Sequence, residues 1–103
     1  MRVSKQLPNI NYMIEALERE NFYCTMIYMP EEELEFEGLP VKGITIFDIS
    51  DISDGIATYR GVAFCSVKDK FNRVTGTKIA FERAYAELRK DYTREYMKEI
   101  FDV

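Results

Sequence analysis

The most constraining feature of the sequence is its last quarter, which contains no proline or glycine after Gly76. From Val74 or Thr77 to about Phe101, apolar side chains recur every three or four positions, which is the spacing of one face of an α-helix. A helix of about 25 residues is roughly 37 Å long, and this exceeds the diameter of a domain of 103 residues. We therefore expect one long C-terminal helix, part of which extends beyond the body of the protein.

The other predicted elements are shorter. Helical spacing of apolar residues predicts a first helix over residues 9–20, with Asn9 or Asn11 capping its start. Residues 22–29 read FYCTMIYM, a continuous run of strand-forming residues, so we expect a strand that is central in its sheet or covered on both faces. Further strands are predicted over residues 31–37, as a short edge strand, and over residues 43–49 and 56–66, with Gly61 at a bulge or bend.

The predicted order α-β-β-β-β-α indicates an α+β fold, with an antiparallel sheet of about four strands, an N-terminal helix and a long C-terminal helix. A chain of 103 residues without an internal repeat or linker is expected to form a single domain, residues 1–103. It has no apolar run long enough to cross a membrane and no apolar segment at its start, so neither a membrane span nor a signal peptide is predicted. We expect a cytoplasmic protein in which Cys24 and Cys65 are reduced, buried apolar residues.

The sequence contains no histidine. Nucleophile pairs that depend on imidazole, imidazole metal sites and the usual general base at neutral pH are therefore excluded. The spacings G-x-x-x-x-G-K-[ST] and G-x-G-x-x-G do not occur, so no nucleotide-hydrolysing loop is predicted. We expect a protein that is not an enzyme and that has no metal site and no cofactor.

The net charge of −4 is unevenly distributed along the chain. Residues 1–54 carry 4 basic and 11 acidic side chains, whereas residues 55–103 carry 10 basic and 7 acidic ones. The negative net charge of the whole chain argues against non-specific binding to duplex DNA. The opposite signs of the two halves indicate either that they pair, within one chain or between two copies, or that the basic half holds an anion.

The segment between the last strand and the long helix is the first candidate for a functional site. Between Lys68 and Arg83 there are five basic and two acidic residues, and the start of the helix offers free backbone N–H groups. A phosphorylated ligand would stack on Phe71 and hydrogen-bond with Asn72, while basic side chains neutralise its phosphate. In the alternative, structural interpretation, Phe71 anchors the loop in the core and Asn72 caps the helix. The candidate ligand-binding residues are Lys70, Phe71, Asn72, Arg73, Lys78 and Arg83.

An acidic tract in the first half of the chain is the second candidate. Regularly spaced carboxylates imitate the phosphates of a nucleic acid and attract a basic channel on a partner protein. The same alternation of acidic and apolar residues is typical of an edge strand that keeps its charges in water. The candidate partner-binding residues are Glu31, Glu32, Glu33, Glu35 and Glu37.

The end of the long helix is the third candidate. Aromatic and methionine side chains are enriched in protein interfaces, so an apolar face on an overhanging helix favours self-association, most simply as a dimer. Alternatively, the tail folds back and covers the parent sheet. The candidate interface residues are Tyr92, Tyr96, Met97, Ile100 and Phe101.

The segment from residue 61 to residue 84 carries a distinctive pattern. Gly61-Val62-Ala63-Phe64-Cys65 is followed by Asp69, by Phe71-Asn72, and by Gly76-Thr77-Lys78-Ile79-Ala80-Phe81-Glu82-Arg83-Ala84. In the form G-x-A-x-C, D-x-F-[DN] and G-x-x-[IL]-A-x-x-R-A, the segment resembles small bacteriophage-encoded proteins, most of which have no assigned role. The resemblance implies a viral anti-defence protein in the cytoplasm of a bacterial host. Such a protein sequesters a cyclic nucleotide signal, which fits the basic segment, or inhibits a host defence protein such as a CRISPR nuclease, which fits the acidic tract.

Overall fold

The structure is a computed structural model that describes residues 1–29, 34–36, 39–53, 57–66, 72–92 and 94–100. Seven helices and strands follow one another in these parts of the chain. In order they are α1 (Pro8–Arg19), β1 (Phe22–Met29), β2 (Leu34–Phe36), β3 (Leu39–Asp51), β4 (Ala57–Ser66), α2 (Arg73–Asp91) and α3 (Arg94–Ile100).

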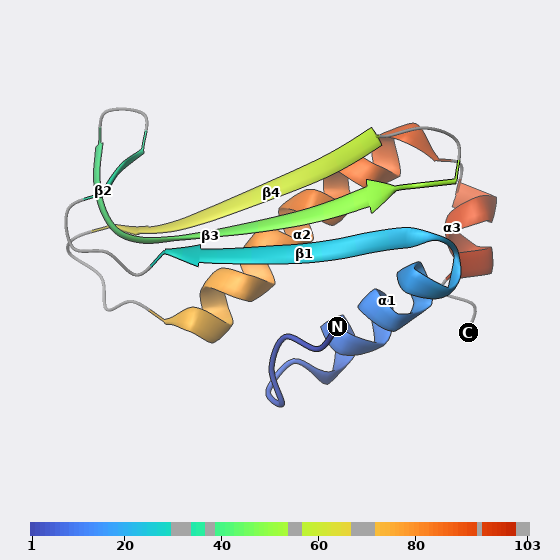
Figure 1. Cartoon of the computed structure of the whole chain (residues 1–103), viewed down its shortest axis with the longest axis horizontal. Helices are drawn as coiled ribbons and strands as arrows, with labels where there is room; N and C mark the ends of the chain where they lie inside the picture. Colours follow the sequence, from blue (N-terminus) through green and yellow to red (C-terminus); the bar gives the residue numbers. More distant parts are fainter. Residues whose placement is uncertain (30–33, 37–38, 54–56, 67–71, 93, 101–103) are drawn as a thin grey trace.

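The β-sheet is antiparallel, and β3 is its central strand (Figure 1). β4 pairs along one edge of β3, and β1 and β2 both pair along the other, β2 with residues 39–41 and β1 with residues 44–51. The sheet is therefore three strands wide although four strands build it. These findings confirm the predicted α+β class, with an antiparallel sheet and helices at both ends of the chain. The prediction of about four strands did not foresee that two of them share one edge of β3.

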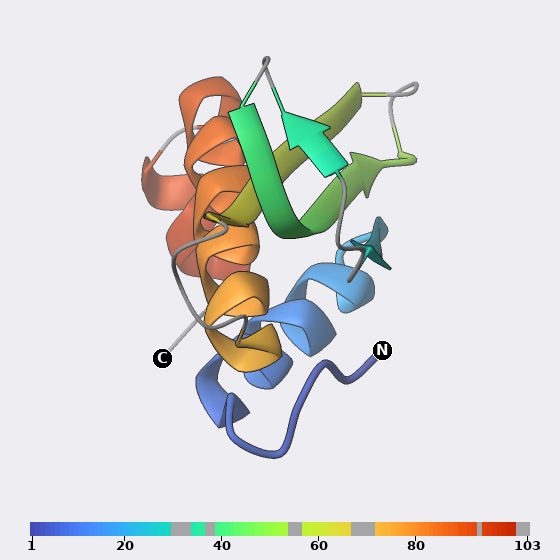
Figure 2. The same cartoon turned by 90° about the vertical axis from the view of Figure 1, so that its left-hand side faces the viewer.

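The sheet bends where β2 pairs with the start of β3 (Figure 2). The register of β3 against β4 shifts between Val41 and Gly43, and a bulge of this kind bends a strand and increases its twist. Gly61, which the sequence predicts at a bulge or bend, lies instead in a regular stretch of β4 opposite Phe47.

The helices α1 and α2 lie on the same side of the sheet (Figure 2). α2 packs on β3 and β4, and α1 packs on β1. The core between the two layers includes the fully buried side chains of Ile14, Leu17, Phe47, Ile49, Phe81 and Leu88. Among the described residues, no helix covers the opposite face of the sheet.

β1 is an edge strand, not the central or doubly covered strand that its apolar run predicts. Phe22 and Cys24 are buried, whereas Tyr23 and Ile27 are 57% and 50% exposed. The apolar run is continuous because side chains on both faces of β1 are apolar, although helices cover only one of these faces. The run therefore marks an exposed apolar surface rather than a central position.

α1 begins at Pro8, whose ring fixes the backbone angle φ that the first turn of a helix requires. The two asparagines expected to cap the helix do not do so, because the N-cap position is occupied by Leu7. Asn11 is 3% exposed; its side chain accepts a hydrogen bond from the N–H of Val3 and donates one to the carbonyl of Ser4. Asn11 thus holds the N-terminal segment against α1.

The C-terminal helix is interrupted, so the prediction of one long, overhanging helix is wrong. Tyr92 has extended backbone angles, and α3 turns back onto the body of the protein. Met97 and Ile100 are 7% and 5% exposed, and Tyr92 and Tyr96 pack against the core. Burying this apolar face in the chain's own core removes it from water, which a helix continuing into solvent would not do. Four of the five predicted interface residues are thus used within the chain, and Phe101 lies outside the described residues.

Candidate functional site

The residues predicted to bind a ligand begin at the start of α2. Asn72 is the N-cap of this helix: its Oδ1 accepts hydrogen bonds from the N–H groups of Val74, at 3.0 Å, and Thr75, at 3.2 Å. Its side chain therefore has the role that the structural interpretation assigns to it. The guanidinium of Arg73 lies over the ring of Tyr28, 4.4 Å from its centre, and so contacts β1.

The other two predicted ligand-binding cations on α2, Lys78 and Arg83, lie elsewhere. Arg83 donates from Nη1 to the carbonyl of Val62 in β4, at 2.6 Å, while Lys78 lines a groove beside α1. Arg73, Lys78 and Arg83 follow one another at intervals of five positions, and each interval is a rotation of about 140° around the helix axis. Arg73, Lys78 and Arg83 therefore point in three directions, and the structure does not bring them together. Outside the described residues lie Lys70 and Phe71.

The predicted partner-binding residues are placed only in part. Glu35 lies in β2, of which the structure describes the backbone and its pairing with Pro40. Figure 1 shows this short strand at one end of the sheet, beyond the helices. Outside the described residues lie Glu31, Glu32, Glu33 and Glu37.

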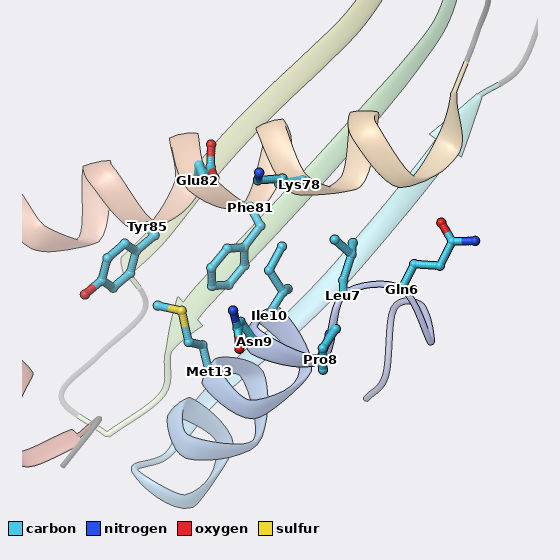
Figure 3. Close-up of a pocket in the computed structure, with 10 residues that line it drawn as sticks. All are labelled: Gln6, Leu7, Pro8, Asn9, Ile10, Met13, Lys78, Phe81, Glu82 and Tyr85. Carbon is cyan, nitrogen blue, oxygen red and sulfur yellow. The ribbon is translucent and has the colours of Figure 1, made fainter. Parts of the chain in front are cut away.

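A groove of about 440 Å³ lies between the start of α1 and the middle of α2 (Figure 3). Its apolar lining residues are Leu7, Pro8, Ile10, Met13, Phe81 and Tyr85, and its polar ones are Gln6, Asn9, Lys78 and Glu82. Figure 3 shows Ile10, Met13 and Phe81 pointing toward one another across the groove, whereas Glu82 points away from α1. An apolar cavity of this volume with a few polar groups at its rim is typical of a small-molecule site.

The aromatic wall of the groove is rigidly held. Phe81 packs edge to face on Phe47 of β3, with ring centres 5.2 Å apart, and parallel to Tyr85, with centres 6.1 Å apart. Burial raises the pKa of Tyr85, and the neighbouring Arg89 only partly offsets this effect. The Tyr85 phenol therefore remains protonated at neutral pH. Lys78 makes no ion pair or hydrogen bond with another described residue, so its ammonium group is available at the rim.

A smaller cavity of about 290 Å³ lies beside the start of α2, lined by Val3, Ser4, Arg73, Val74 and Thr77. Its polar groups already have partners within the chain. The hydroxyl of Thr77 donates to the carbonyl of Arg73 at 2.8 Å, and the Arg73 guanidinium lies over Tyr28. We therefore regard the larger groove as the candidate site.

A cluster of carboxylates and phenols, which the sequence analysis did not single out, lies where α2 ends. Tyr92 donates a hydrogen bond to Oδ2 of Asp51, and Ser53 donates to Oδ1 from its N–H at 3.0 Å and from its hydroxyl at 2.7 Å. Tyr59 donates to Oδ2 of Asp91 at 2.8 Å. The sequence contains a signal for this cluster. Side chains on a strand alternate between its two faces, so Asp51 lies on the same face as Phe47 and Ile49, toward the helices. A carboxylate buried at such a position needs hydrogen-bond partners.

The pKa shifts of this cluster indicate a structural role. Burial alone would raise the pKa of Asp51, but hydrogen bonds from Tyr92 and Ser53 outweigh it and hold the pKa below 3.8. Burial and the hydrogen bond to Asp91 raise the pKa of Tyr59 to about 12. Near neutral pH the carboxylate is therefore ionised and the phenols are protonated, so none of these groups is poised for general acid–base catalysis.

The described residues contain no group of three or more histidine, cysteine, aspartate or glutamate side chains that could hold a metal ion. Cys24 and Cys65 form no disulfide bond, and the predicted burial is confirmed for Cys24, whereas Cys65 is half-buried. Burial, assisted by the charge of Glu18, raises the pKa of Cys24 to about 12, so its thiol is unreactive at neutral pH.

No family model, curated protein or solved structure matches the chain. The function must therefore be inferred from the geometry of the chain itself. No helix in the described part of the chain has both the length and the apolar character needed to cross a lipid bilayer.

Proposed function

We propose that the protein is a non-enzymatic binding protein that sequesters a small phosphorylated ligand with a single negative charge, such as a cyclic mononucleotide, in the groove between α1 and α2. The observation that carries the proposal is an apolar groove of about 440 Å³ with a lysine at its rim, Lys78, that has no ion-pair partner in the described part of the chain. Of the predicted ligand-binding residues, the proposal retains Lys78 as the phosphate-binding group.

The charges at the rim determine the class of ligand. Lys78 supplies one positive charge, and Glu82, one helical turn further along α2, supplies a negative one. A nucleoside triphosphate would bring several negative charges against a single cation and an adjacent carboxylate, which like-charge repulsion disfavours. A cyclic phosphodiester carries one negative charge and matches the single ammonium group.

The walls of the groove suit the rest of such a ligand. The base of a nucleotide is flat and apolar on its faces, and it would pack against Met13 and the half-buried ring of Tyr85. The side-chain amides of Gln6 and Asn9 at the rim have both donors and acceptors for the edge of a base. Sequestration of a cyclic nucleotide is also one of the anti-defence roles that the phage resemblance implies.

Inhibition of a host nucleic-acid enzyme by the acidic tract is the second candidate function. The observation in its favour is the position of β2, because this strand carries Glu35 at the end of the sheet and away from the groove. In that case replacing Glu32, Glu33 and Glu35 with glutamine abolishes capture of the host enzyme, whereas Lys78→Ala leaves capture unchanged.

Thermal melting with a panel of nucleotides tests the groove proposal. At 100 times its Kd, a ligand stabilises the folded state by about 2.7 kcal/mol, which raises the Tm of a chain this size by several degrees. We expect this shift with cyclic mononucleotides and little or none with ATP. Lys78→Ala should weaken the binding about fivefold, since an exposed charge pair contributes about 1 kcal/mol.

Lys90→Ala is the matched control, because Lys90 also lies on α2 but pairs with Glu87, away from the groove. Its melting shift should equal that of the unchanged protein. Equal losses in the two lysine variants, or a larger shift with ATP than with cyclic mononucleotides, would contradict the proposal.

A further inference from the structure

The face of the sheet opposite the helices consists of four rows of side chains that run across the three strands. In the register of the sheet, Ile27 of β1 lies opposite Ile46 of β3, which lies opposite Val62 of β4. The next row toward β2 is also apolar and contains Met29, Ile44 and Phe64. Two adjacent rows thus form an apolar surface that no helix covers in the described part of the chain (Figure 2).

Part of this surface is open to solvent. Ile27 is 50% exposed and Phe64 is 44% exposed, while Ile46 and Val62 are half-buried. Ile44, between Met29 and Phe64, is buried, so the accessible part of the patch lies at its two edge strands. In the row of Ser50 and Thr58, Tyr23 is 57% exposed on the same face. A contiguous apolar patch on one face is typical of an interaction site, whereas singly scattered apolar residues are not.

The other two rows are polar, and their charges cancel. Asp48 and Arg60 are opposite one another on β3 and β4 and form a two-pronged ion pair, with N–O distances of 2.8 and 2.9 Å. The hydroxyls of Ser50 and Thr58 are within 3.1 Å of each other in the last row. The described side chains of the four rows carry no other charge, so this part of the face is neutral on a chain of net charge −4.

This neutrality decides between classes of partner. A nucleic acid requires free cations, and the guanidinium of Arg60 is already paired with Asp48. Two copies of an acidic chain repel one another over most of their surfaces, but not where the local charges cancel. A second copy therefore meets little electrostatic repulsion at this neutral, partly apolar face.

We propose that two copies of the chain associate face to face through this side of the sheet. In a two-fold symmetric pair the same patch is used by both copies, so the apolar rows of one sheet pack on the apolar rows of the other. Stacked sheets lie about 10 Å apart, which leaves room for Ile27 and Phe64 to interdigitate. The ion pair of Asp48 and Arg60 flanks this contact and exchanges partners across it. The groove lies on the helical side of the sheet, so each copy keeps its groove open.

Analytical ultracentrifugation over a range of concentrations, with variants of this face, tests the proposal. We expect the unchanged protein to form dimers and Ile27→Asp to weaken the dimer roughly a hundredfold, because an interface carboxylate without a partner loses its hydration. Tyr12→Asp is the matched control: Tyr12 is 43% exposed, but it lies on α1, away from this face. A protein that remains monomeric at every concentration, or equal effects of the two variants, overturns the proposal.

A charge exchange provides a second, independent measurement. Arg60→Asp places two carboxylates opposite each other and should dissociate the dimer, whereas the double variant with Asp48→Arg and Arg60→Asp restores neutrality and should restore the dimer. Circular dichroism checks that each variant remains folded. If the double variant is as dissociated as the single one, the face does not carry the dimer. Neither outcome depends on whether a nucleotide binds in the groove.

Discussion

Gly61 determines how closely α2 approaches the sheet. A Cβ atom at this position would lie 1.9 Å from the carbonyl oxygen of Ala80 and 2.4 Å from the nitrogen of Ala84, so only glycine fits. The pattern that resembles phage proteins thus contains a strand glycine and the two helix alanines against which it packs. Arg83 of the same pattern holds a β4 carbonyl, and Asn72 caps α2. These residues attach α2 to β4, and the anti-defence role that the resemblance implies stays a prediction.

A substitution at this contact should destabilise the protein more than one at a glycine nearby. Gly61→Ala forces two backbones apart, and we expect it to lower the free energy of unfolding by about 2 kcal/mol or more. In Gly76→Ala the new Cβ would meet no backbone atom but the side chain of Thr45, with the hydroxyl oxygen at 2.8 Å and the Cβ at 3.7 Å. The gain of about 1 kcal/mol from replacing a helical glycine then offsets most of that cost. Urea unfolding measures both changes, and equal losses would mean that α2 does not approach β4 this closely.

Among the elements, α3 is the one that the sequence pattern misplaces. Periodicity indicates which residues share a helix face, and it predicts the helical character of residues 94–100. It does not reveal that the helix stops at Asp91, because no proline or glycine marks the break. The break depends on contacts between residues that are far apart in the sequence. Tyr92 packs edge to face on Phe22, with ring centres 5.8 Å apart, and donates a hydrogen bond to Asp51.

The attachment of α3 should therefore depend on pH. The pKa of Asp51 is lowered in the folded state, so its stabilising contribution is present near neutral pH and is lost as the pH falls through that value, below 3.8. Tyr92→Phe removes one hydrogen bond to the carboxylate. We expect this variant to raise the pKa of Asp51 and to cost about 2 kcal/mol of stability near neutral pH.

An NMR titration of the Asp51 carboxyl group, together with urea unfolding near neutral pH, measures both effects. Tyr12→Phe is the control, since the Tyr12 side chain is exposed on α1. An unchanged pKa of Asp51 in Tyr92→Phe would show that this hydrogen bond does not position α3.

At the scale of the whole molecule, the fold class was predictable and the site was not. The α+β class follows from local patterns: the span of β1 agrees with the prediction, and those of α1 and β4 agree to within one residue at each end. The groove could not be predicted from local patterns, because Ile10 and Met13 meet Phe81 only after α1 and α2 have packed on the sheet. The sum of the charges along residues 68–83 contains no information on the direction of each side chain. For this reason a single site was predicted where Arg73, Lys78 and Arg83 of α2 lie apart from one another.

The uneven distribution of charge along the sequence also has a partial explanation in the fold. Asp48 from the acidic half pairs with Arg60 from the basic half, so at least one pair joins the two halves within one chain. Lys78 has no such partner among the described residues, and its position at the groove makes it available to a ligand there.

The most direct test of the central claim is a proton–nitrogen NMR titration of the protein with cyclic adenosine monophosphate. The groove proposal predicts that the amide signals that shift belong to residues on both sides of the groove, Ile10 and Met13 on α1 and Phe81 and Tyr85 on α2, while those of Tyr23 and Ile27 on the far face of the sheet remain unchanged. Shifts confined to the start of α2 around Asn72 and Arg73, or no shifts at a saturating concentration, would contradict it.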